Sequence, residues 1–459
     1  MAQELRDFVK AAAEEFGLPG AAVGVLVDGQ RVYASHGTTA LVDGLPMDER
    51  TLFPVASTTK PFTATALVRL AAEGRVDLGA PVRRYVPDLK LADEKAADRI
   101  TVLQLLNHTG GLDWNLIPDE DNETLAGFVE QMDRLEVIAA PGERASYSQA
   151  GYNLAGRVIE NVTGLPYERA VTSLVLEPAG LSSTFFDLDD VITRKYAVGH
   201  VRDEEGRLRA ATPWKAFRGT SRANNPGGGG ISTVEDLLSW AEFHLADGEG
   251  VLPAESVRAM REQTVELRAS TLGDGFGICW FLKWIDGVLT ISHGGSGNGQ
   301  FAELLIVPER NFAVVSLSNA GPEGYPFNQS VVRWALEHYL GLVERDPEPV
   351  AYDDARSREV AGRYQNDVMN LDIATDGARL TLAVGIKPEV RSASDAEMPP
   401  DYAAEPMGFL PAEGGGDEAG DEYVITEGGL KGQRGFFTRD AAGRVTGVDL
   451  AGRLFTRTS

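Results

Sequence analysis

The sequence predicts two parts: a large α+β domain and, after it, a small barrel-like all-β domain. Strand-like segments occur near the N-terminus and again between residues 276 and 319, with mostly helical patterns between them. Strands at both ends of a helical region favour one mixed domain whose sheet is assembled from distant parts of the chain. Beyond residue 355 the sequence has short strands with alternating apolar residues, which are typical of a small barrel or sandwich.

The elements of the first part follow in order. A helix is expected over residues 4–16, and AAVGVLVDGQRVYASHG then gives two strands. Asp28-Gly29 lies between these strands and is a strong signal for a hairpin turn. From about residue 81 to 290 the pattern is mostly helical and rich in loops. Strands return in GICWFLKWIDGVLTISHGG and FAELLIVPERNFAVVSLSN, and a helix containing VVRWALEHYLGL follows them.

A charged segment with two prolines, ERDPEPVAYDD, marks the boundary between the two parts. We therefore expect a first domain over residues 1–343, a linker over 344–355 and a second domain over 356–459. Leu371, Ile373 and Thr375 alternate before the turn signal Asp376-Gly377. The alternation resumes after that turn, as expected for a hairpin.

Composition excludes several classes of function. The 459 residues carry a formal net charge of −25, which argues against nucleic acid or an anionic membrane as a partner. The chain has one cysteine, Cys279, so no internal disulfide is expected. No secretory signal and no long apolar run is seen, so the default expectation is a cytoplasmic protein.

The segment PVASTTKPFTATALVRLAAEG breaks a local rule of helix design. Apolar spacing predicts a helix over residues 59–72, with Gly74 as its stop. A structural capping box would place Glu or Gln three residues after Ser57, whereas this chain has Lys60 there. A cation is disfavoured at the positive end of a helix dipole. Such broken rules are expected at functional sites, and this one directs a lysine toward a serine hydroxyl.

Other ways of activating a nucleophile find no support in the sequence. No serine has the Gly-x-Ser-x-Gly surroundings of a hydrolase elbow. The six histidines are scattered, and the phosphate-binding pattern GxxxxGK[ST] is absent. We therefore expect neither a metal nor an organic cofactor. His108, in NHTGG, is expected to hold a loop by hydrogen bonds.

Ser-x-x-Lys is common by chance, but here two further motifs accompany it in order. The three motifs are Ser57-Thr58-Thr59-Lys60, Tyr147-Ser148-Gln149 and His293-Gly294-Gly295. With them the chain resembles the serine β-lactamase and penicillin-binding-protein superfamily, and within it the branch of class C β-lactamases, esterases and D-aminopeptidases. The resemblance implies an antiparallel sheet flanked by helices, plus a helical subdomain. The C-terminal part resembles the lipocalin-like β-domains attached to some members.

The resemblance, with the chemistry of the residues, implies their catalytic roles. Ser57 would attack a carbonyl carbon and become the acyl-enzyme. Lys60, desolvated near a helix start, should have a lowered pKa. It would share the role of general base with Tyr147 as a coupled pair. The backbone N–H groups of Ser57 and Ser296 would form the oxyanion hole.

Substrate-binding roles are implied for four more residues: Gln149, His293, Gly294 and Gly295. Gln149 stands where asparagine is more usual, and its extra methylene moves the amide by about 1.5 Å. His293 stands where β-lactamases usually have a lysine, and a histidine is mostly neutral near pH 7. This difference favours neutral esters or amides over penicillins and cephalosporins. The two glycines would let a substrate approach the strand closely.

These observations predict a serine hydrolase that cleaves a small ester or amide through an acyl-enzyme. A D-amino-acid amidase or peptidase is one alternative, and a β-lactamase is another. An alternative of a different class is a non-catalytic ligand-binding protein of the same fold. The expected partner is a small-molecule ester or amide, or a short peptide, and a homo-oligomer is left open. We also expect the C-terminal domain to contribute a loop over the active site.

Overall fold

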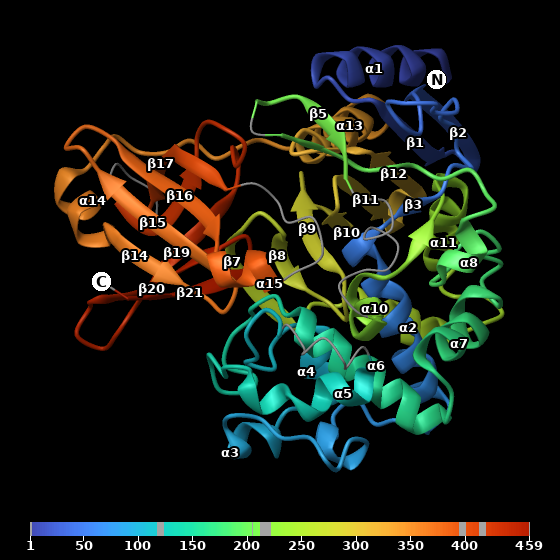
Figure 1. Cartoon of the computed structure of the whole chain (residues 1–459), viewed down its shortest axis with the longest axis horizontal. Coiled ribbons are helices and arrows are strands. Elements are labelled where there is room, and N and C mark those ends of the chain that lie inside the picture. The colour runs from blue at the N-terminus through green and yellow to red at the C-terminus, as the bar shows by residue number, and fades with distance from the viewer. Residues whose placement is uncertain are drawn as a thin grey trace.

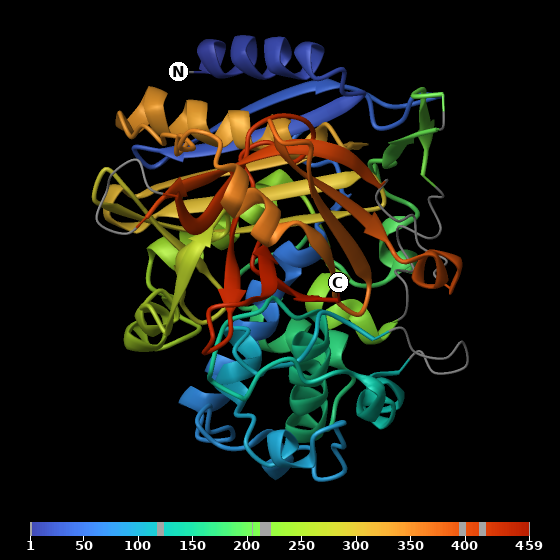
Figure 2. The ribbon, with the colours of Figure 1, turned by 90° about the vertical axis from the view of Figure 1, so that its left-hand side faces the viewer.

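The computed structural model of the chain describes residues 2–116, 124–203, 205–211, 222–393, 401–412 and 419–458. In these ranges eight antiparallel strands form a main sheet, and eight further strands form a closed barrel beside it (Figure 1). The predicted fold class, an α+β domain followed by an all-β barrel, is confirmed. Turned by 90°, the molecule shows the barrel, in orange to red, in front of the main sheet (Figure 2).

The main sheet joins the two ends of the first domain. Its order is β2-β1-β12-β11-β10-β9-β8-β7. The bounds are β1 Gly20–Val27, β2 Gln30–Gly37, β7 Val265–Ser270, β8 Gly273–Phe276, β9 Phe281–Ile285, β10 Val288–Gly297, β11 Gln300–Val307 and β12 Phe312–Ser318. Val25 of β1 lies opposite Val314 of β12, so the sheet is assembled from distant segments as predicted. The hairpin turn at Asp28-Gly29 is also confirmed, with φ of 51° and 71°.

The prediction of helices and loops up to about residue 290 is wrong for β7 and β8. These short strands form the edge of the sheet next to the barrel (Figure 1). β7 does alternate apolar and polar residues, but over only six positions, a run that is easily overlooked beside the longer helical patterns before it.

Helices cover both faces of the main sheet. On one face lie α1 Ala2–Glu15 and α13 Gly324–Ala335, which continues as a π-helical turn over Leu336–Leu340. The opposite face packs against α2 Lys60–Ala72 and α11 Val234–Leu245. α2 buries ten of its thirteen residues, so it runs through the core rather than over the surface. A helix buried on all sides can hold a reactive side chain in one position.

The helical subdomain lies below the sheet in Figure 1. Its helices are α3 Glu94–Ala97, α4 Val102–Leu106, α5 Leu125–Glu130, α6 Gln149–Thr163 and α7 Tyr167–Val171. The first domain also has the short helices α8 Leu188–Val191, α10 Asn225–Gly228 and α12 Ala254–Met260. α4 begins with a capping box between Thr101 and Gln104, and α6 ends at Gly164 in the left-handed conformation. No described helix combines the length and apolar character needed to cross a membrane.

Short elements complete the first domain. The 3-10 helices are η1 Ala56–Thr59, η2 Val82–Arg84, η3 Met132–Arg134, η5 Arg222–Asn224 and η6 Pro308–Arg310, and the turn η4 Thr172–Leu176 is π-helical. The short strands are β3 Phe53–Pro54, paired with β6 Ile231–Ser232, and β4 His200–Arg202, which lies between β5 Leu208–Ala210 and β13 Ala320–Gly321.

The barrel is formed by strands in sequence order, closed by the pairing of its first and last strands. The bounds are β14 Gly362–Gln365, β15 Met369–Thr375, β16 Leu380–Ile386, β17 Tyr402–Pro411, β18 Ala419–Ile425, β19 Arg434–Arg439, β20 Val445–Leu450 and β21 Arg453–Arg457, with helices α14 Asp354–Val360 and α15 Pro388–Ala393. Alternate residues of β15 and β16, such as Leu371 and Leu382, fill its interior.

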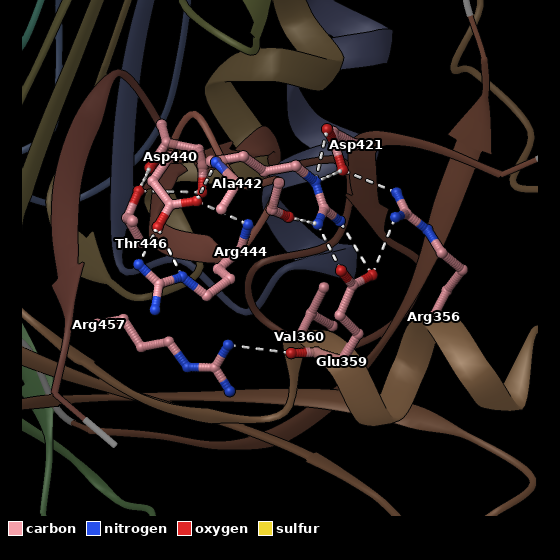
Figure 3. A network of polar contacts seen from close by, with 12 residues as sticks. Arg356, Glu359, Val360, Asp421, Asp440, Ala442, Arg444, Thr446 and Arg457 are labelled. Carbon is pink, nitrogen blue, oxygen red and sulfur yellow. Dashed lines mark hydrogen bonds and ion pairs between the residues drawn. The ribbon is translucent and has the colours of Figure 1, made fainter.

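Ion pairs fix α14 against the barrel wall (Figure 3). Arg439 of β19 pairs with Asp421 at 2.9 Å and with Glu359 of α14. Arg356 of α14 also reaches Asp421, at 2.7 Å. Each of these two arginines therefore forms an ion pair with at least one carboxylate.

Candidate active site

Ser57 lies in a turn that the backbone holds under strain. The preceding residue, Ala56, has φ of 45°, a left-handed conformation that is costly for a residue with a side chain. Thr59 secures the turn, since its hydroxyl donates to Ala56 O at 2.6 Å and accepts from Gly230 N at 2.9 Å. The α-helix begins only at Lys60, so Ser57 stands in the 3-10 turn that leads into it.

Lys60 is fully buried and makes three polar contacts. Its Nζ lies 2.8 Å from Gln149 Oε1, 2.7 Å from the carbonyl oxygen of Gly227 and 3.2 Å from Ser57 Oγ. Burial lowers the pKa of Lys60 to about 7, because an ammonium group loses its hydration here. No carboxylate is among its three partners to restore that pKa.

The three contacts suit the neutral amine. A neutral lysine has two N–H donors and one lone pair, whereas the ammonium form has three donors. Two of the contacts are to carbonyl oxygens, which can only accept, so they take the two N–H groups. The lone pair is then left facing the Ser57 hydroxyl, which can donate. The arrangement can therefore take a proton from Ser57 without moving a heavy atom.

Tyr147 is held over this pair by its neighbours. Ser146 N donates to His108 O at 2.9 Å, and Ser148 N donates to His108 Nδ1 at 3.0 Å. The His108 ring also packs on the Tyr147 ring at 4.3 Å between centroids. His108 thus holds the loop, as expected from the sequence, and its own pKa is lowered by burial.

The Tyr147 hydroxyl is buried. Burial raises the pKa of Tyr147, and the Ser57 side chain opposes that rise without cancelling it. Tyr147 therefore stays a phenol at neutral pH while Lys60 becomes neutral near pH 7. Because the two environments shift these pKa values in opposite directions, Tyr147 can act as a proton donor and Lys60 as a proton acceptor.

Gln149 is occupied at both ends of its amide. Its Oε1 accepts from Lys60, and its Nε2 donates to Asn153 Oδ1 at 3.1 Å and to Asn224 O at 3.3 Å. A Cβ at Gly227 would lie 2.0 Å from Gln149 Nε2, so only a glycine leaves room for the longer side chain. The glutamine therefore positions Lys60, and the glycine at 227 accommodates it.

The His293-Gly294-Gly295 motif lies on β10, which packs against η1. A Cβ at Gly295 would lie 2.1 Å from Val55 O and 2.9 Å from Ser57 N. The space at Gly295 is therefore taken up by the serine turn itself, and the glycine allows the strand to reach it. At Gly294 the corresponding space on the other face belongs to the Glu303 side chain, 2.8 Å away.

His293 is buried between aromatic rings. Its ring lies 4.7 Å from Phe281 and 6.3 Å from Tyr147, measured between centroids. Burial lowers the pKa of His293 to about 3, so the ring is uncharged at neutral pH. Its Nδ1 lies 2.8 Å from Gly294 O, and its Nε2 has no protein partner among the described residues.

The C-terminal barrel contributes to the same site. Tyr147 N donates to Gly452 O at 2.8 Å, and the guanidinium of Arg453 lies 4.9 Å from the Tyr147 ring centroid. The expectation that this domain supplies a loop over the site is confirmed. Gly452 and Arg453 themselves were not singled out from the sequence, and neither was the carbonyl of Gly227.

Two carboxyl groups meet where the turn between β14 and β15 contacts the segment that follows α4. Asp367 N donates to Asp113 Oδ2 at 3.0 Å, and Asn115 N donates to Asp367 Oδ2 at 2.9 Å. Burial raises the pKa of Asp367 to about 8, and the nearby charge of Asp113 adds to this rise. Burial also raises the pKa of Asp113. At neutral pH the pair therefore retains a proton.

Within the described ranges no group of three or more histidine, cysteine, aspartate or glutamate residues is placed to hold a metal ion.

Comparisons with known proteins agree with this geometry. The beta-lactamase family model matches residues 5–336. Penicillin-binding protein 4 of Amycolatopsis lactamdurans is 29% identical over 320 residues, which are 68% of this chain and 83% of that protein. The crystal structure of SurE with D-Leu superimposes with a TM-score of 0.73 at 25% identity, covering 99% of this chain and 100% of that chain. An octameric penicillin-binding protein homologue from Pyrococcus abyssi does so with a TM-score of 0.67 at 25% identity, covering 99% of each chain.

Proposed function

Because the chain belongs to the beta-lactamase family, we propose that it is a serine hydrolase that cleaves a small ester or amide through an acyl-enzyme on Ser57. One observation carries the proposal. Lys60 Nζ has two carbonyl acceptors and faces the Ser57 hydroxyl, and its lowered pKa leaves it neutral near pH 7. A serine hydroxyl becomes a useful nucleophile when such a base takes its proton.

The proposed reaction has two halves. In the first, Ser57 Oγ attacks the carbonyl carbon while its proton passes to Lys60. The tetrahedral intermediate then expels the alcohol or amine, which receives a proton from Tyr147, and the proton on Lys60 passes to Tyr147. In the second half water attacks the ester carbonyl and gives a proton to Tyr147, whose own proton passes to Lys60. Lys60 then returns a proton to Ser57 Oγ as the acid is released.

The backbone N–H groups of Ser57 and Ser296 are proposed as the oxyanion hole. Their support is the close approach of β10 to η1 at Gly295. His293 and the two glycines would border the bound acyl group, and Gln149 would act mainly by positioning Lys60.

A second candidate is hydrolysis of a D-amino-acid amide or a short peptide. It is favoured by the likeness to SurE with D-Leu, which extends through the barrel. β-Lactam hydrolysis is a third candidate, since the family model and the A. lactamdurans relative point to that chemistry. The octameric homologue also favours assembly of several copies of this chain.

The test is hydrolysis of p-nitrophenyl acetate and butyrate by the wild-type protein and by Ser57→Ala. Nitrocefin and D-alanine p-nitroanilide, assayed in parallel, rank β-lactam and amide against ester. We expect ester turnover that disappears in the variant, and a fluorophosphonate adduct on Ser57 by mass spectrometry. A folded wild-type protein that hydrolyses none of these compounds and forms no adduct would instead be a ligand-binding protein.

A further inference from the structure

The turn between β20 and β21 is the part of the barrel that reaches the site. Leu450 lies opposite Arg453, so Ala451 and Gly452 form a two-residue turn, both with positive φ. Gly452 O accepts the hydrogen bond from Tyr147 N, and Leu454 N lies 3.4 Å from Ser146 Oγ. These contacts fix the position of Arg453 relative to Tyr147.

Arg453 lies against the catalytic tyrosine. Its guanidinium carbon is 4.9 Å from the centroid of the Tyr147 ring and 5.5 Å from that of Trp114. Lys60 Nζ also lies 4.9 Å from the Tyr147 centroid. The charge of Arg453 lowers the pKa of Lys60, although burial is the main cause of that shift. Arg453 therefore acts electrostatically on the reacting groups.

No carboxylate among the residues that the structure describes forms an ion pair with Arg453, although the charge of the buried Asp449 acts on it from a longer distance. The Nε of Arg453 is buried without a hydrogen-bond partner, and its Nη1 has a long contact of 3.4 Å to Ala451 O. The nearby carboxyl of Asp449 lies 3.9 Å from Arg144 and accepts from Gly452 N at 3.1 Å. In contrast, Arg439 on the same barrel contacts two carboxylates, those of Glu359 and Asp421.

A partly buried guanidinium without an anion is costly for the folded protein. It is also a ready partner for a planar carboxylate, which it can bind through two parallel hydrogen bonds. The other basic side chains around Tyr147 do not fill this role. His108 and His293 are neutral because burial lowers their pKa values, and Lys60 is committed to Ser57.

We propose that Arg453 is the carboxylate receptor of the active site, and that the favoured substrate bears a carboxylate on its leaving group. The carboxylate is assigned to the leaving group, and not to the acyl group, because Arg453 lies against Tyr147. This inference rests on the proposed function, in which Tyr147 protonates the leaving group. A neutral residue at position 293 therefore does not make the site neutral, because the fixed positive charge comes from the second domain.

The test compares two thioesters with the same acyl group, hippurylthioglycolate and its carboxamide, hippurylthioglycolamide. Released thiol is measured with dithiobisnitrobenzoate, and Cys279, the one cysteine of the chain, is buried. We expect kcat/KM of wild type to favour the carboxylate by about ten- to hundredfold, the range for a hydrogen bond to a charged group. Arg453→Gln should bring this ratio close to one, and Arg453→Lys should keep part of it.

Arg444→Gln is the matched control. This barrel arginine pairs with Asp440 at the surface, away from the site, so the ratio should stay at the wild-type value (Figure 3). If Arg453→Gln does not fold, the Arg453→Lys variant still reports on the preference.

A binding measurement separates this inference from the proposed function. Calorimetric titration of Ser57→Ala with each compound needs no turnover, and the carboxylate should bind at least tenfold more tightly. The preference should disappear in Ser57→Ala/Arg453→Gln. Equal affinities in Ser57→Ala, including no detectable binding of either compound, would overturn the role of Arg453. Failure of fluorophosphonate to label wild type would overturn only the acyl-enzyme.

Discussion

Lys60→Met should remove a pH dependence of folding that the wild-type protein carries because it buries an amine. An ordinary lysine has a pKa of about 10.4, whereas burial lowers the pKa of Lys60 to about 7. Between these two values the unfolded chain binds one more proton than the folded chain. The free energy of unfolding of wild type therefore rises with pH in this window, by about 1.4 kcal/mol per pH unit.

The whole window corresponds to about 4 to 5 kcal/mol, which is a large part of the stability of an ordinary domain. Methionine does not titrate, so Lys60→Met lacks this contribution. Between pH 7 and 9 the free energy of unfolding of wild type should rise by about 2 kcal/mol relative to that of the variant. The comparison cancels the titration of all other groups, which the two proteins share.

Urea unfolding at several pH values, followed by fluorescence, measures this difference. In the same range kcat/KM of wild type should rise with pH and level off above about 7, as Lys60 loses its proton. Lys60→Met should lose ester turnover at every pH. A constant difference in stability between the two proteins would mean that Lys60 keeps its ordinary pKa, and that the Nζ contacts are those of an ammonium group. The role of base would then pass to Tyr147.

Four other substitutions test the surroundings of the site. Gly295→Ala should lower kcat/KM by about a hundredfold, because its Cβ would meet Val55 O at 2.1 Å and displace Ser57. The control Gly294→Ala should lower kcat/KM far less, since the Glu303 side chain can move. Equal losses in the two variants would refute the explanation. Gln149→Asn should lower kcat/KM by about tenfold, because the shorter amide cannot reach both Lys60 and Asn224. Unchanged steady-state kinetics would show that Lys60 does not need the hydrogen bond to Gln149. The free energy of unfolding of Asp367→Asn, relative to that of wild type, should be larger at pH 8 than at pH 5 by about 3 to 4 kcal/mol. Because the pKa of Asp367 is raised to about 8 in the folded protein, the free energy of unfolding of wild type falls as pH rises toward that value. The amide of the variant does not titrate. Urea midpoints that respond identically to pH in the two proteins would contradict this.

Much of the fold could be predicted because local patterns and long-range packing agree. The turn at Asp28-Gly29 and the alternation around Leu371 and Leu382 are local signals that the structure confirms. β7 was missed because its alternation covers only six residues and follows a long stretch of helical pattern. The closure of the barrel by β14 and β21 is a pairing between distant segments, which periodicity cannot reveal.

The residues of the candidate site also divide into those that local sequence patterns could identify and those that only the folded structure brings together. Ser57 and Lys60 could be related from the sequence because one helical turn fixes their separation. Tyr147 was found through its motif, and its environment adds a direction for its pKa that no motif contains. Gly227 contributes a carbonyl, which every residue has, so its type gives no clue to the role. Arg453 follows an ordinary hairpin turn, and its importance arises only from where the barrel docks.

The pairing of β1 with β12 has a consequence for the newly made chain. β1 is buried along its whole length and needs β12 on one side, yet β12 follows after almost 300 further residues. At about 5 to 20 residues per second, ribosomal synthesis leaves that apolar strand edge without its partner for roughly 15 to 60 s. We therefore expect the nascent β1–β2 hairpin to need protection by a chaperone, and Ser57 is synthesised long before the sheet that supports it.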